Sequence, residues 1–476
     1  MKSFRAPASP IRPRFYVFLG FLALIALAGG AARVDEPAHA VTRVGAVAYM
    51  AWLSWTLSTR EVRRFAIPLA ILAAIALIGL VQLVPLPPGL WTAMPGRAAY
   101  ADAAAAAGIS QPWRPVALVP DRCWNAVLGL LTPVAALLGL SGFNMAERAR
   151  LLPAFLVLTG VSLLIAATQF AGTGTGLIGW YRSAWQFNAS GLFTNRNHQA
   201  LLIAIAIPAL AVWTAEPRSG GRERMTAPAR LAFCIAGFAG LIVMLFATGS
   251  RAGLLWGAIG FVLALVLTGA RMRTGIAGWR SRTRRLMGWM AALTVALFAV
   301  LLFLLRDSEA LRRLMAMDPT QDPRVRAWRG AAAMTGEMFP FGTGMGAFEF
   351  VFRRYELPGE LTYESMNQVH SEPFAAVVEM GLPGLLLVLA IAAAWVWAAR
   401  RAWRPDGSTL QRLGVGALLL VGLATTVDYP TRTPLMAVLC AMYVAWAAPR
   451  PLRQSSGSLR ASTGPGADRH GFTVPS

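Results

Sequence analysis

Apolar runs of about 20 residues recur along this chain, and they constrain its fold more than any other feature. A helix of that length crosses a hydrocarbon core ~30 Å thick. Runs such as 69–84 and 254–267 are apolar on every helical face, whereas transmembrane β-strands alternate apolar and polar residues over ~10-residue segments. The sequence therefore predicts an all-α, polytopic bundle of transmembrane helices.

The composition supports a membrane protein and argues against a nucleic-acid-binding one. Only 14% of the 476 residues are charged, compared with roughly 25% in soluble domains. The net charge of +22 would suggest nucleic acid in a soluble protein. Here most arginines lie in short segments between apolar runs, where the positive-inside rule accounts for them. The cysteines, Cys123, Cys234 and Cys440, lack zinc-site spacing and predict no disulfide framework.

The spans are numerous and follow one another closely. We predict an N-terminal helical segment at 1–64, a main membrane region at 65–448 and a Ser-, Gly- and Pro-rich disordered tail at 449–476. The twelve expected spans are 15–32, 41–59, 65–84, 124–142, 151–170, 197–214, 230–248, 252–269, 286–305, 372–398, 410–427 and 433–448.

The first span has some features of a secretory signal. Basic residues precede it, and Ala38-His39-Ala40 resembles a signal-peptidase site. The apolar run at 15–32 is longer than a usual signal core, however, and further spans follow. We therefore expect an uncleaved first helix.

Arginine placement predicts the orientation. Dense groups at 60–64, 218–230 and 271–285 fall on the same side as the N-terminus, so both termini are expected to be cytoplasmic.

Three longer segments then face outward, at 85–123, 171–196 and 306–371. The last is too long for a plain connector. The spacing of its apolar residues predicts two short amphipathic helices near the membrane surface, at Leu311, Leu314 and Met315 and at Val325, Trp328 and Ala332.

Polar residues at the membrane boundary are the candidates for chemistry, because such groups are costly unless paired or functional. Arg251, between two apolar runs, is either a turn residue whose guanidinium reaches the interface or a clamp for a phosphate. Arg324 and Trp328 share a predicted helix face and could equally belong to a plain charged surface. The glycines of 340–346 resemble a nucleotide-binding loop only weakly, and a flexible hinge before Phe348 is the expected role.

Three further clusters contain the remaining candidates. His370 is either a passive hydrogen-bonding group or a proton acceptor, since its ordinary pKa lies near working pH. Asn195 could cap the helix that follows it. Asp428 could simply pair with Arg432. All five clusters fall on the outer side under a topology deduced without them, and this agreement favours a functional interpretation.

These residues resemble motifs of the O-antigen ligase family, which includes polysaccharide polymerases and protein O-oligosaccharyltransferases. The similar stretches are FTNRNHQA (193–200), TGSRAG (248–253), RVRAW (324–328), PFGTGMGAF (340–348), HSEPFAAVVEMGLPG (370–384) and DYPTRTP (428–434). The resemblance implies a membrane glycosyltransferase of GT-C-like architecture in a bacterial inner membrane. It would transfer a glycan from undecaprenyl diphosphate to an acceptor hydroxyl on the periplasmic face, with no metal or other cofactor.

The resemblance also implies roles for particular residues. Arg251 and Arg324 would bind the carrier's diphosphate, and His370 would be the base that activates the acceptor. Family members often have Asn directly after this His, whereas Ser371 follows here. Second-rank substrate-binding candidates are Arg182, Arg196, Arg326, Asn195, Asn197, Glu379, Asp428 and Arg432.

The sequence leaves more than one acceptor for the glycan. We favour ligation to lipid A-core over polymerisation of O-antigen or exopolysaccharide. The alternative from another class is a polysaccharide or lipid transporter or flippase. Such a protein should contain internal repeats and charges near the bilayer midplane, and neither is apparent in the sequence.

Overall fold

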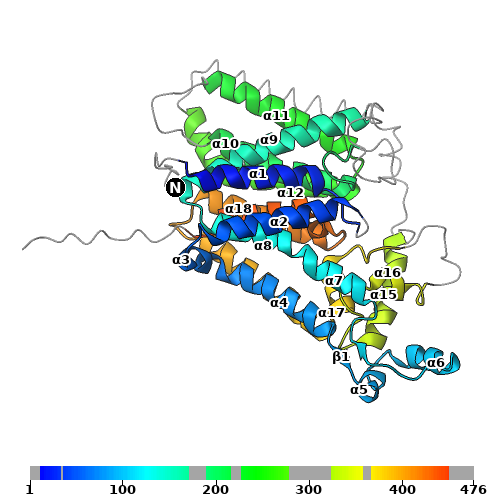
Figure 1. The fold of residues 1–476 in the computed structure, drawn as a ribbon. Helices are drawn as coiled ribbons and strands as arrows, with labels where there is room; N and C mark the ends of the chain where they lie inside the picture. Colours follow the sequence, from blue (N-terminus) through cyan, green and yellow to red (C-terminus); the bar gives the residue numbers. More distant parts are fainter. Residues whose placement is uncertain are drawn as a thin grey trace, which may run out of the picture.

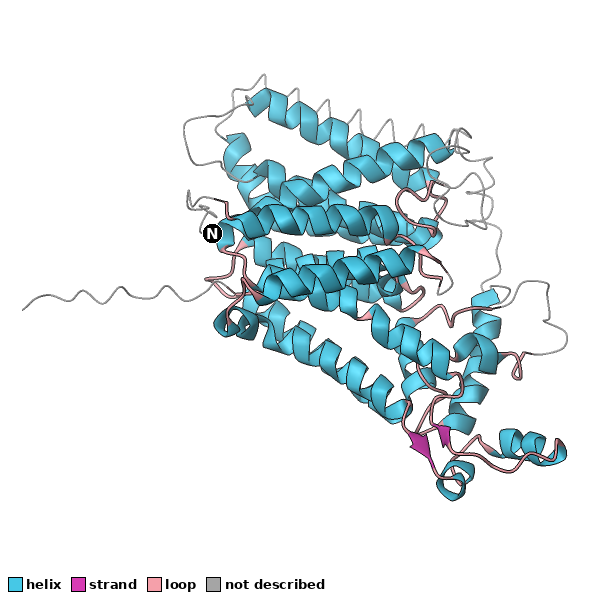
Figure 2. Ribbon diagram, in the orientation of Figure 1, coloured by secondary structure: helices cyan, strands magenta, loops and turns pink. Residues whose placement is uncertain are grey.

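The computed structural model describes residues 11–33, 36–170, 189–215, 227–277, 323–356 and 366–449. Within these ranges the protein is mostly a bundle of long helices (Figure 1), with one short sheet (Figure 2) in which β1 (Pro85–Leu86) pairs antiparallel with β2 (Arg114–Pro115). The helices are α1 (Pro13–Ala28), α2 (Ala38–Ser54), α3 (Thr59–Val62), α4 (Ala66–Gln82), α5 (Pro88–Thr92), α6 (Ala98–Ala106), α7 (Pro120–Gly129), α8 (Leu131–Ser141), α9 (Met145–Phe170), α10 (Arg196–Ala215), α11 (Ala227–Ala247), α12 (Arg251–Ala277), α15 (Pro323–Met338), α16 (Phe348–Phe352), α17 (Glu372–Ala402), α18 (Thr409–Thr425) and α19 (Pro434–Ala447), with 3-10 turns η1 (Arg63–Phe65) and η4 (Pro430–Arg432).

The helical prediction is confirmed, but the number of membrane crossings is not. Every predicted span except 286–305, which lies outside the described residues, coincides with described helix. Among the described residues, six helices are long and apolar enough to cross a membrane: Thr59–Gln82, Pro120–Ser141, Met145–Phe170, Arg196–Ala215, Arg251–Gly269 and Glu372–Ala402. Four more apolar helices, including α1 and α19, are shorter. In the outer segment 306–371, α15 matches the second predicted amphipathic helix, and the first lies outside the described residues.

Helix α10 forms the centre of the bundle. It is packed against α9, α11, α12 and α18, and its residues from His198 to Val212 are all buried. Helix α12 approaches it very closely, since a Cβ on Gly260 would lie 2.3 Å from the Ala204 carbonyl oxygen. Small residues at helix contacts allow such an approach in membranes. A helix this enclosed can hold polar groups at its end in a fixed position.

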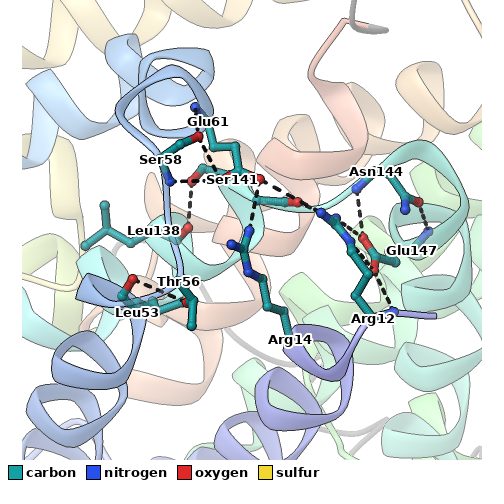
Figure 3. Close-up of polar contacts among 11 residues, drawn as sticks. Arg12, Arg14, Leu53, Thr56, Ser58, Glu61, Leu138, Ser141, Asn144 and Glu147 are labelled. Carbon is teal, nitrogen blue, oxygen red and sulfur yellow. Dashed lines mark hydrogen bonds and ion pairs between the residues drawn. The ribbon is translucent and has the colours of Figure 1, made fainter. Parts of the chain in front are cut away.

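The two ends of the bundle are chemically different, and Figure 3 shows one of them. There Arg12 binds the fully buried Glu147, and Arg14 Nη1 lies 2.9 Å from Glu61 Oε1. Trp446 near the end of α19 donates to the Arg148 carbonyl at the same end, 3.0 Å away. We call this end, defined by Arg12, Glu61 and Glu147, the Arg12 face.

The opposite end, here called the site face, gathers the starts of several helices. The carbonyl of Gly29, after the end of α1, accepts from Leu435 N at 2.9 Å, and that of Gly30 accepts from Thr194 N at 3.2 Å. The starts of α10 and α19 therefore lie beside the end of α1. Because α1 begins at the Arg12 face, the first described residues and the motifs at 193–200 and 428–434 are at opposite ends of the bundle.

A glycine-rich junction joins the outer segment to α17 near the site face. Helix α17 is interrupted at Gly381, which has φ 63° and ψ −139°. The loop at 342–346 fits against this interruption: Thr343 N donates to the Val378 carbonyl at 3.1 Å, and Gly344 N to that of Glu379 at 2.9 Å. A Cβ on Gly342 would lie 2.6 Å from the carbonyl oxygen of Glu379. The expectation of a flexible hinge was wrong, because these glycines permit a tightly packed backbone junction.

Adding a methyl group at this junction should destabilise the protein. Gly381→Ala places a Cβ 2.0 Å from the Pro340 carbonyl oxygen, in a left-handed backbone conformation. We expect a loss of about 1–3 kcal/mol in the free energy of unfolding, measured by denaturation in detergent. Gly160→Ala in α9 is the control, since no atom lies within 4 Å of the added Cβ. Equal stability of the two variants would contradict this account of the junction.

Candidate active site at the site face

A buried carboxylate, that of Asp428, organises the polar residues of the site face. Its side chain is 1% exposed and accepts a hydrogen bond from Asn197 Nδ2 at 2.7 Å and from the Tyr429 backbone N at 2.9 Å. Asn195 Nδ2 lies 3.4 Å from both of its oxygens. His198 Nε2 is 3.7 Å from Oδ1. A buried charge requires such partners, and the start of α10 and the neighbouring Tyr429 provide them.

Two helix caps extend the network around Asp428. Asn195 Oδ1 accepts from the backbone N of Asn197 at 2.9 Å, so it caps α10 as predicted. Ser250 caps α12 by accepting from Gly253 N at 2.9 Å, and its hydroxyl donates to Asn197 Oδ1 at 2.8 Å. We call Asn195, Asn197, His198, Ser250 and Asp428 the polar node. The node fixes the starts of α10 and α12 next to each other.

Each of these two helices begins with an arginine. Arg196 opens α10 and is half-buried, and Arg251 opens α12 and is exposed. A cation at a helix N-terminus opposes the helix dipole. An anion bound there would interact favourably with the guanidinium groups and with the first backbone N–H groups. The local charge pattern is therefore suited to a phosphate or another anion.

His370 is connected to the node through Tyr429. Its ring centroid is 5.0 Å from that of Tyr429, and the ring of His198 is 5.7 Å from Tyr429. His370 has φ 56°, a left-handed conformation unusual for a residue other than glycine. Trp328 Nε1 donates to the carbonyl of the preceding Val369 at 2.8 Å. The imidazole is half-buried at this position.

The expected pair between Asp428 and Arg432 was wrong. Arg432 Nη2 donates to Glu379 Oε2 at 3.2 Å instead, and Asp428 faces the polar node. Arg432 is the last residue of the 3-10 turn η4, and Asp428 precedes that turn. In the same turn, Thr431 N donates to Glu372 Oε1 at 2.7 Å. Arg432, Glu379 and Glu372 therefore fasten the loop after α18 to α17, close to His370.

The structure tests the remaining candidates only in part. Arg182 lies outside the described residues. Arg324 and Arg326 are in the first turn of α15, but their side chains are outside the described part of the structure. No group of three or more His, Cys, Asp or Glu residues that could hold a metal ion occurs within the described ranges.

Sequence reasoning missed several contributors. His198, Ser250 and Tyr429 all lie inside the quoted motifs, directly beside residues that were selected. Their adjacency to the selected Asn197, Arg251 and Asp428 was the available signal. Arg97 had none. It is fully buried and donates to the carbonyls of Val116 at 2.8 Å and Gly342 at 3.1 Å. Burial lowers the pKa of Arg97 to about 10, which leaves it charged at neutral pH.

Removing the carboxylate at the centre of the node should loosen the site face. Asp428→Ala leaves the amides of Asn195 and Asn197 without their buried acceptor, and we expect a loss of about 1–3 kcal/mol in the free energy of unfolding. Thermal unfolding in detergent measures this. Asp406→Ala, at an exposed turn after α17, should change stability by less than about 0.5 kcal/mol. An Asp428→Ala protein as stable as this control would show that the node does not support the fold.

One comparison with known proteins is informative. Residues 236–389 match the family model described as O-antigen ligase. No curated protein matches the sequence. The matched region includes Arg251, α15, the glycine-rich junction and His370. The motifs at 193–200 and 428–434 lie outside it, yet they contact it through Asn197–Ser250 and Tyr429–His370. The match over residues 236–389 supports the O-antigen ligase family for this helical membrane chain.

Proposed function

We propose that the protein transfers a glycan from undecaprenyl diphosphate to an acceptor hydroxyl, with O-antigen ligation to lipid A-core as the favoured reaction. One observation supports this most strongly: two helices begin with arginines, at Arg196 and Arg251, and Asn197 and Ser250 join the starts of these helices. Tyr429 and Asp428 connect that pair to His370. An anion site and a potential base thus belong to one set of contacts.

The diphosphate is both the handle and the leaving group of such a donor. As the bond between the anomeric carbon and the diphosphate oxygen breaks, negative charge grows on the phosphates. Preorganised cations and helix N-terminal N–H groups stabilise developing charge at fixed positions. Arg251 is proposed for this role, with Arg324 on α15 as its partner. Arg196 is a further candidate, because α10 begins beside α12.

His370 supplies the other half of the reaction in this proposal. The acceptor oxygen forms its bond to the anomeric carbon as the bond to the diphosphate breaks, and the hydroxyl proton passes to a His370 nitrogen. The products are the extended acceptor and undecaprenyl diphosphate. A positioned base of this kind contributes roughly 10²–10⁴-fold to a rate. The half-buried setting of His370 permits an acceptor to approach while its backbone stays fixed.

The orientation follows from the arginine distribution along the sequence. The Arg12 face would be cytoplasmic and the site face periplasmic. A lipid-linked glycan presented at the outer leaflet of the inner membrane would then meet Arg251 and His370 directly.

A reconstituted assay tests the function. Proteoliposomes receive undecaprenyl-diphosphate-linked glycan with lipid A-core or with a second glycan-carrier as acceptor. Free carrier diphosphate formed only when lipid A-core is present supports ligation, and formation with the second carrier alone supports polymerisation. Movement of the lipid across the bilayer without bond cleavage would replace the proposal with a flippase.

A further inference from the structure

His370 is the only non-glycine residue with positive φ among those that the structure describes. Left-handed backbone is unfavourable for a residue with a Cβ and persists where its surroundings enforce it. The neighbours of His370 provide that constraint: Val369 is 1% exposed and Ser371 8% exposed. The direction of the imidazole therefore depends on how this short segment is held.

A side chain distant in sequence, that of Trp328, makes a polar contact to the segment. Its indole N–H donates to the Val369 carbonyl at 2.8 Å, across 41 positions of sequence. The donor sits on a well-anchored helix, because Ala331, Met334 and Met338 of α15 are fully buried in a cluster with Val369, Ala375 and Val378. This carbonyl belongs to the peptide group that joins Val369 to His370. The indole thus fixes one side of that peptide plane.

The ring of His370 is bounded on another side by Tyr429, and Tyr429 in turn by His198. Neither ring contact fixes the backbone. The hydrogen bond from Trp328 therefore has a specific consequence: it connects the helix that contains Arg324 to the backbone of the proposed base. Trp328 follows Arg324 by four residues, or about one helical turn.

We propose that Trp328 is a positioning residue, which holds His370 in its left-handed conformation through the Val369 carbonyl and so aims the imidazole at the acceptor hydroxyl. This inference rests on the proposed function.

The test variant is Trp328→Phe, which keeps an aromatic ring against the cluster and removes the N–H donor together with part of the ring volume. The matched control is Trp395→Phe. Trp395 is also half-buried and also donates its indole N–H to a backbone carbonyl, that of Val415 at 3.1 Å, at the contact between α17 and α18. The two substitutions remove the same type of bond, so they should cost similar stability.

The measurements are the single-turnover transfer rate, the donor's KM and thermal unfolding in detergent. A misplaced catalytic group can slow a reaction by about 10²-fold. We expect Trp328→Phe to lower the rate by about 10- to 100-fold with the donor's KM changed less than about twofold, while Trp395→Phe transfers at the wild-type rate. Equal rates for the two variants, or a Trp328→Phe defect confined to KM, would overturn the positioning role.

Two further variants separate the possible failures. If His370→Ala and Arg251→Ala both transfer glycan normally, the proposed function of the site fails and takes this inference with it. If both are inactive while Trp328→Phe behaves like Trp395→Phe, only the role of Trp328 is wrong. Replacing Trp328 with benzothienylalanine, in which sulfur takes the place of the indole N–H, should reproduce the rate defect of Trp328→Phe, and full activity of that protein would also overturn the proposal.

Discussion

Arg251→Ala is expected to lower glycan transfer by about 10²–10³-fold or more, the range seen when one preorganised donor to a developing charge is removed. The guanidinium stands at the first residue of α12, whose start is fixed by Ser250 and by Asn197. Arg251→Lys should recover only part of the activity, because an ammonium cannot bind a phosphate with two parallel hydrogen bonds. The transfer rate in proteoliposomes, normalised to inserted protein, measures both effects.

Arg400→Ala is the matched control for this experiment. Arg400 is also exposed, but it lies near the far end of α17, a helix of 31 residues that is roughly 45 Å long. This variant should transfer glycan at the wild-type rate. If Arg251→Ala is as active as Arg400→Ala, the arginine at the start of α12 does not contact the leaving group.

His370→Ala is expected to slow the chemical step by roughly 10²–10⁴-fold and to leave carrier binding nearly unchanged. The imidazole would act on the acceptor's proton, whereas the arginines hold the diphosphate. Single-turnover kinetics and a carrier-binding titration separate these two effects. His39→Ala is the control, since His39 is in the first turn of α2, which packs mainly on α1 and α8.

The opposite pattern would change the role of His370. A His370→Ala protein that binds the carrier weakly but transfers at the normal single-turnover rate would make His370 a binding residue. Transfer at the normal rate with normal binding would remove it from the site.

Hydrophobic runs predicted the positions of the helices well, because any long apolar segment in a membrane must satisfy its own backbone hydrogen bonds. The number of helices that cross the membrane stays a prediction. Helix α2 contains His39, Thr42 and Arg43 and is not among the apolar helices long enough to span. The interruption of α17 was also missed, since Gly381 and Pro383 inside an apolar run are compatible with a continuous helix in sequence. The positive φ at Gly381 depends on contact with Pro340, far away along the chain.

Polar residue types beside apolar runs predicted several of the residues that gather at the site face, whereas their pairings were not predicted. Asp428 and Arg432 are four residues apart, so a local ion pair was a reasonable expectation. The turn η4 sends Arg432 to Glu379 and leaves Asp428 to Asn197, 231 positions away in sequence. Such partners follow from how α10, α12 and α18 pack, which no local pattern encodes. The same reason explains why Trp328 was placed on a helix face but not on the Val369 carbonyl.

The account depends on Arg251 and His370 acting at one site on the outer face of the membrane. Single-cysteine variants at 251, 370 and 400, made after replacing Cys123, Cys234 and Cys440, can be treated in intact spheroplasts with a membrane-impermeant maleimide. We expect labelling at 251 and 370 without lysis, and labelling at 400 only after lysis. Labelling of 251 and 370 from opposite faces, or of both only after lysis, would contradict the proposed site.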